Sequence, residues 1–171
     1  MKATKFIVLV GGILGILAFF LPMVSIHRAD FNGSVSAFQV IKGLSKASEV
    51  VSSANVNAAG IDSAVTSADL AQAKEGIDSM KGIVAAIFVP AILLTLIGGL
   101  AVKRKQFGRG AGALTLIFGL IGLGIATILR SAAEGDAGIA LTLLLVTGLA
   151  GTVGGLLALV KPERLAKPVA A

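Results

Sequence analysis

Long stretches without a charged residue alternate with polar segments along this chain. Four such apolar stretches cover residues 6–26, 82–102, 111–129 and 137–160. Each has about the 20 residues that an α-helix needs to cross roughly 30 Å of hydrocarbon. A membrane β-barrel would alternate apolar and polar positions, whereas these stretches are apolar on every face. The pattern predicts an all-α membrane protein with a bundle of four transmembrane helices in a single domain.

Two prolines fall within these stretches. Pro22 lies near the end of the first and is expected to help end that helix. Pro90 lies one third of the way along the second, where the lost backbone hydrogen bond predicts a kink. Lys2 and Lys5 before the first stretch leave a cleaved signal peptide as an alternative. We expect a retained helix, because the apolar run is long and no small-x-small site follows it.

Residues 27–81 form the one large segment outside the predicted spans. Asn32-Gly33 lies between two stretches rich in β-branched and aromatic residues, which is a strong hairpin signal. We therefore predict a β-hairpin with strands near 24–31 and 34–41 and with Asn32 and Gly33 in its turn. Asn32-Gly33-Ser34 also matches the glycosylation acceptor pattern, although nothing else indicates a eukaryotic secretory protein.

The rest of this segment predicts short helices. Apolar residues recur at helical spacing over residues 44–55, which indicates an amphipathic helix. A second helix is expected to start near Ser67 and to run directly into the second span, with a loop over residues 55–63 between the two. Their weakly apolar stripes either pack within the chain or offer a surface to a partner.

Composition supports a lipid environment. The chain has 171 residues, of which 56% are hydrophobic and 14% charged, and its mean hydropathy is +0.95. Soluble domains average about 25% charged residues. Cysteine, Trp and Tyr are absent, so disulfides and thiolate metal sites are excluded, and any aromatic anchoring at the interface falls to Phe. The net charge of +6 comes from clusters at span ends, which argues against a nucleic-acid partner.

Those basic clusters predict the orientation. Lys103, Arg104, Lys105 and Arg109 crowd the short linker between the second and third spans, and further cations flank both chain ends. Because positive residues in short loops stay cytoplasmic, we expect both termini inside and residues 27–81 outside the inner membrane of a bacterial cell. The four linker residues either fix topology alone or also attract anionic lipid headgroups.

No residue pattern indicates catalysis. His27 is the only histidine and lies at a membrane edge, and the acids Asp62, Asp69, Glu75 and Asp78 are scattered along the outer segment. The Gly-rich stretch 108–112 lacks the ending of a phosphate-binding loop. No ionisable residue lies within a span, which disfavours a proton pump. We expect no enzyme, no cofactor and no metal site.

Small residues recur at intervals of four in three of the spans. Gly11 and Gly15 are so placed in the first, Thr147, Gly151 and Gly155 in the fourth, and Thr115 and Gly119 in the third. Such spacing lets helix backbones approach closely in lipid. We predict helix packing there, either within the bundle or between copies of the chain.

The order of spans, with a large first outer loop and a short basic inner linker, resembles the layout of claudin-like proteins, although their loop tryptophan and cysteine pair are absent. The phrase FFLPMVSI (residues 19–26), followed by GSVSAFQVIKG (residues 33–43), resembles small bacterial membrane proteins of unassigned function. Neither resemblance implies an activity.

Two hypotheses follow for function. The first is a non-enzymatic structural or accessory membrane protein whose partners, besides the lipid bilayer, are other copies of itself or another membrane protein. The second is a small transporter or channel subunit that acts as an oligomer, with its path lined by the Gly-rich helices and the helix that contains Pro90.

Overall fold

The computed structural model describes residues 4–28, 31–57, 67–104, 107–133 and 136–161, the side chains of 26–28, 31–32, 54–57 and 67–69 excepted. The fold is mostly helical. In chain order its elements are α1 (Thr4–Ala18), β1 (Pro22–Arg28), β2 (Phe31–Ser36), α2 (Ala37–Asn57), α3 (Ser67–Ala86), α4 (Val89–Lys103), α5 (Arg109–Ala132) and α6 (Ile139–Val160).

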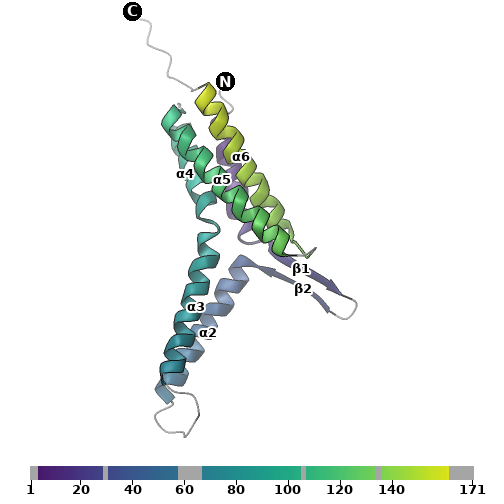
Figure 1. Ribbon diagram of the computed structural model, residues 1–171, viewed down its shortest axis with the longest axis vertical. Helices are drawn as coiled ribbons and strands as arrows, with labels where there is room; N and C mark the ends of the chain where they lie inside the picture. Colours follow the sequence, from purple (N-terminus) through teal and green to yellow (C-terminus); the bar gives the residue numbers. More distant parts are fainter. Residues whose placement is uncertain (1–3, 29–30, 58–66, 105–106, 134–135, 162–171) are drawn as a thin grey trace, which may run out of the picture.

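Four of the helices, α1, α4, α5 and α6, form a bundle (Figure 1). Within it, α1 packs on α4 and α6, and α5 packs mainly on α6. The helices α2 and α3 leave one end of the bundle as an antiparallel pair, and the β1–β2 hairpin projects sideways from the same end (Figure 1). We call the α2–α3 pair the arm. The other end of the bundle holds the start of α1 and the end of α6.

The bundle has small residues inside and large apolar residues outside. Glycine, alanine and threonine make up most of the buried positions of α1, α5 and α6. Leucine, isoleucine and valine side chains such as Leu96, Ile117 and Leu149 are about half exposed. A soluble protein would have the reverse distribution. Over the described residues, three helical stretches are long and apolar enough to cross a membrane: Arg109–Ala132, Ile139–Val160 and Leu70–Lys103, the last of which comprises most of α3 together with α4.

The first apolar stretch does not form the long helix that was expected. Helix α1 has 15 residues, which is about 22 Å at 1.5 Å per residue, and the chain turns at residues 19–21 before strand β1 begins at Pro22. The prediction of one helix over 6–26 was wrong in its last third. Proline cannot donate a helical hydrogen bond, and residues 22–26 form strand pairs instead.

The second stretch is divided between two helices. Helix α3 ends at Ala86 and α4 begins at Val89, with Pro90 in its first turn. Proline has no N–H for the carbonyl of Ala86, and its ring crowds that carbonyl. The expected kink at Pro90 is therefore a two-residue break at Ile87 and Phe88, where the helix changes direction (Figure 1). The third and fourth stretches form α5 and α6 within two or three residues of their predicted bounds.

The hairpin exists, but its turn does not lie at Asn32-Gly33. Asn32 pairs with His27 and Gly33 with Ile26, so both residues lie inside strand β2. The chain reverses between Arg28 and Phe31. The register is continuous from the Val24–Val35 pair to the Arg28–Phe31 pair, and an irregularity between Pro22 and Val24 separates it from the Pro22–Ser36 pair at the open end. The turn preference of Asn-Gly is overridden because both residues take part in this continuous strand pairing.

A capping box fixes the end of β2 and starts α2 at residue 37, earlier than the predicted 44. The Gln39 backbone N–H donates to Ser36 Oγ over 3.2 Å, and the Ser36 backbone N–H donates to Gln39 Oε1 over 3.0 Å. This reciprocal pair satisfies two backbone donors at the helix start. The predicted start of α3 near Ser67 is confirmed, and the predicted loop over 55–63 gives way to α2 as far as Asn57.

Strand β1 is also clamped to the connection between α5 and α6. The Ser25 N–H donates to the Asp136 carbonyl over 2.9 Å, and the Gly138 N–H donates to the Met23 carbonyl over 2.7 Å. An isolated two-stranded hairpin is marginally stable in water. These bonds give it a third partner, and the hairpin is thereby fixed to the bundle.

Candidate functional site

The arm is the largest feature that the bundle does not need for its own packing. Helix α3 contacts chiefly α2, and α2 contacts chiefly α3 and strand β2. An open groove of about 950 Å³ runs between the two helices. It is lined by Val51, Ser52, Leu70, Ala71, Lys74, Glu75, Asp78 and Ser79.

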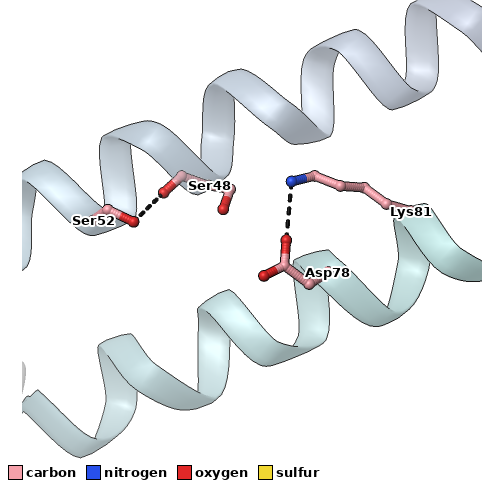
Figure 2. A network of polar contacts seen from close by, with 4 residues as sticks. All are labelled: Ser48, Ser52, Asp78 and Lys81. Atoms are coloured by element: carbon pink, nitrogen blue, oxygen red, sulfur yellow. Dashed lines mark hydrogen bonds and ion pairs between the residues drawn. The ribbon is translucent and has the colours of Figure 1, made fainter.

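The seam of the arm is polar as well as apolar. Lys81 Nζ donates to Asp78 Oδ1 over 2.9 Å, and Ser52 Oγ donates to the Ser48 carbonyl over 2.8 Å (Figure 2). Ser48 is buried between the helices. Serine side chains add little apolar contact, so burial stabilises the arm less than it would an arm with leucine at these positions.

The ion pair changes the acidity of Asp78. The hydrogen bond from Lys81 lowers the pKa of the Asp78 carboxyl below its ordinary value of 3.8, with further lowering by the charges of Lys81 and Lys74 and by the Ser48 hydroxyl on α2. This pKa shift was not predicted, although the spacing of three residues between Asp78 and Lys81 on one helix was an available signal.

A titration of the Asp78 carboxyl in the full chain should give a pKa below 3.8. Because the folded-state pKa is the lower one, the pair stabilises α3 above the ordinary pKa, and this stabilisation is lost as pH falls through the folded-state value. The Lys81→Met substitution should raise the pKa of Asp78, as followed by NMR of the side-chain carboxyl. Lys42→Met on α2 is the control, and an equal effect of both would contradict the pairing.

Several large apolar side chains of the arm are exposed. Val50 is 67% exposed, Ile83 63% and Met80 59%. Val50 and Met80 lie in the part of the arm beyond the predicted second span, where lipid would not cover them. The arm therefore presents apolar side chains together with the charges of its groove.

An aromatic cluster joins the arm to the bundle. The Phe19 ring lies 5.1 Å from Phe88 and 6.1 Å from Phe38, both at steep interplanar angles, and Phe20 lies 5.6 Å from Phe38. Edge-to-face pairs contribute about 0.5–1.5 kcal/mol each beyond burial. The cluster connects the end of α1, the start of α2 and the break before α4, and so fixes where the arm leaves the bundle.

The small residues predicted for helix packing in α1 lie at its contacts with α6 and α4. A Cβ on Gly11 would lie 2.5 Å from Ala150 Cβ of α6, and a Cβ on Gly15 would lie 2.5 Å from Ala91 Cβ of α4 and 2.8 Å from Thr147 Cγ2 of α6. Thr147 Oγ1 lies 2.9 Å from the Gly11 carbonyl and 2.8 Å from the Leu143 carbonyl, so its hydroxyl proton is shared between the two helices. All of these contacts lie within one chain.

The remaining small residues lie between α5 and α6. A Cβ on Gly151 would lie 2.9 Å from Gly119 Cα, and a Cβ on Gly155 would lie 2.6 Å from Leu116 N. Two further close glycines were not predicted: Gly98 lies against Leu9 of α1, and Gly148 against Leu123 of α5. Gly98 has no small residue four positions away, whereas the spacing of Gly148 and Thr152 was an available signal.

The predicted lipid-headgroup residues lie at the end of the bundle opposite the arm. Lys103 and Arg104 end α4, and Arg109 begins α5, all three with exposed side chains. Lys105 lies outside the described residues, as does Asp62. His27 lies on β1. Among the residues that the structure describes, no group of three or more His, Asp or Glu side chains is placed to hold a metal ion.

No protein-family model, curated protein or solved structure matches this chain significantly. Function therefore has to be inferred from the geometry of the chain itself.

Proposed function

We propose that this chain is a non-enzymatic inner-membrane protein that holds the arm outside the bilayer for contact with another protein. The observation that supports it best is the arm itself. It extends from the bundle (Figure 1), its two helices contact chiefly each other, and it presents exposed apolar residues beside an open groove. A segment of this kind makes few contacts with the bundle and adds a large accessible surface.

The proposal includes four spans with both termini in the cytoplasm. Its support is the inverted bundle, with small residues inside and large apolar residues outside, and the uneven distribution of charge. Lys103, Arg104 and Arg109 crowd the short α4–α5 connection at one end of the bundle, whereas the arm beyond the other end carries charges of both signs. Short basic loops stay on the cytoplasmic side, so the arm would lie on the opposite side.

Site-specific photo-cross-linking in native membranes tests the proposed role. A photoreactive amino acid would replace Val50 or Met80 on the arm and, as a control, Leu120, which is 54% exposed on α5 in the bundle. We expect one discrete protein adduct from both arm positions and lipid adducts from residue 120. The adduct should disappear when Val50→Glu is combined with the probe at position 80, because a charge would then face an apolar contact.

Identical adducts from the arm and from position 120, or no protein adduct from the arm, would contradict the proposal. The alternative, a transporter or channel subunit, predicts solute flux in proteoliposomes instead. In a single copy, Gly11, Gly15, Gly119 and Gly151 are all occupied by helix contacts. A path lined by these Gly-rich faces would therefore have to form between copies.

A further inference from the structure

A second groove lies at the basic end of the bundle, between α4 and α5. It has a volume of about 380 Å³, and its walls are Ile97, Leu100 and Ala101 on one side and Ala111 and Leu114 on the other. Arg104 lines it at the end of α4. The groove exists because α4 packs mainly on α1 and α5 mainly on α6, so that these two helices contact each other less closely.

The groove has an apolar floor and faces the lipid side of the bundle. Ala101 belongs to a buried cluster with Phe107, and Ile97 and Ala111 pack partly buried against that cluster. Leu100 and Leu114 at the sides are 52% and 50% exposed. These apolar walls suit a hydrocarbon chain. Among the residues that the structure describes, no side chain fills the groove.

The positive charge at this end of the bundle favours an occupant with a negatively charged headgroup. Arg104 lines the groove. Lys103 and Arg109 are next in sequence to the lining residues Arg104 and Gly108, and Lys5, which is buried, and Lys161 lie at the same end of the bundle. All of the carboxylate side chains that the structure describes lie towards the other end: Glu49, Glu75, Asp78 and Asp136. A ligand with an apolar chain and a negative head would match both the walls and the rim.

We propose that the α4–α5 groove binds an anionic phospholipid, with an acyl chain between Leu100 and Leu114 and the phosphate group beside Arg104. A zwitterionic lipid offers the same acyl chain but no net charge to the cations. The site therefore distinguishes lipids by headgroup. This proposal requires that the bundle lies in lipid, and it is independent of the arm's partner.

A tryptophan reporter tests the site, because the chain has no Trp of its own. The Leu114→Trp variant places the reporter in the groove, and Leu120→Trp places a matched reporter elsewhere on α5. Each would be reconstituted in vesicles that contain brominated phosphatidylglycerol or brominated phosphatidylcholine at equal mole fraction. Bromine quenches Trp fluorescence on contact, so quenching reports which lipid occupies the groove.

We expect the Leu114→Trp reporter to associate about fivefold more with brominated phosphatidylglycerol, equivalent to about 1 kcal/mol for one cation near the surface. The Leu120→Trp reporter should be quenched equally by both lipids. Adding Arg104→Gln should abolish most of the preference, whereas Arg130→Gln, an exposed cation at the opposite end of α5, should leave it unchanged.

Equal quenching of the Leu114→Trp reporter by both lipids would overturn the proposal, as would an equal preference at position 120 or a preference that survives Arg104→Gln. Inorganic phosphate added at millimolar concentration should not displace the lipid. If it did, the groove would bind free anions rather than a phospholipid. All of these variants change exposed positions, and helical circular dichroism checks that each retains its fold.

Discussion

The Gly151→Leu substitution should unfold the bundle at a markedly lower temperature. A Cβ at this position would lie 2.9 Å from Gly119 Cα on α5 and 2.9 Å from Leu94 Cδ1 on α4. The first of these neighbours is backbone, so relief requires α5 and α6 to move apart. Overpacking of this kind costs about 1–3 kcal/mol, occasionally more. The measurement is thermal unfolding in mild detergent, followed by circular dichroism and by the size of the assembly.

Gly124→Leu is the matched control, because a Cβ on Gly124 of α5 would meet no heavy atom within 4 Å. Both substitutions add the same side chain to a helix interior, and both gain the same helix propensity over glycine. Only the first enters a helix contact. If the two variants unfolded at the same temperature as the natural chain, close packing at Gly151 would not stabilise this bundle.

The Gly138→Ala substitution should separate the β-hairpin from the bundle. A Cβ on Gly138 would overlap the Pro22 carbonyl oxygen and approach its carbon within 2.7 Å. These are backbone atoms of β1, and the Gly138 N–H already donates to Met23 beside them. We expect a loss of about 2 kcal/mol, which is within the usual range for a steric clash with backbone. Hydrogen exchange should show faster exchange at Gly138 and Ser25.

Gly108→Ala provides an unusually close control. Gly108 caps the start of α5 and Gly138 the start of α6, with φ and ψ of −78° and 167° against −74° and 170°. The two glycines therefore have the same backbone conformation, which alanine adopts without strain. A Cβ on Gly108 would meet nothing within 4 Å. Equal stability losses would mean that the cap conformation, rather than the contact with β1, accounts for the effect.

The length and hydropathy of the apolar stretches predicted α5 and α6 well, because each is long and contains no proline. The same criterion failed at residues 19–26, which are equally apolar but form a turn and then part of strand β1. Hydropathy measures how apolar a segment is and not its backbone hydrogen-bond partners. The strand pairs of residues 22–26 with β2, and the bonds of Met23 and Ser25 to the α5–α6 connection, come from residues distant in the chain.

A rule based on local sequence could not locate the hairpin turn, for a similar reason. Asn32-Gly33 is a strong turn signal, but the register follows the strand pairs from Val24–Val35 to Arg28–Phe31, which a two-residue signal does not specify. The Ser36–Gln39 capping box was readable in the sequence and would have ended β2 at Ser36. The groove between α4 and α5 had no such signal, because it arises from how two pairs of helices separate.

The short α1 and α4 would have a consequence for a bilayer around the bundle, in the arrangement proposed above. These two helices of 15 residues pack on each other, beside helices of 24 and 22 residues. The flank formed by the short helices would then span less hydrocarbon than the flank formed by the long ones. Lipids accommodate such a mismatch by local thinning, or the protein does so by tilting. A thicker bilayer would therefore change the tilt of the bundle and, with it, the angle between the arm and the membrane plane.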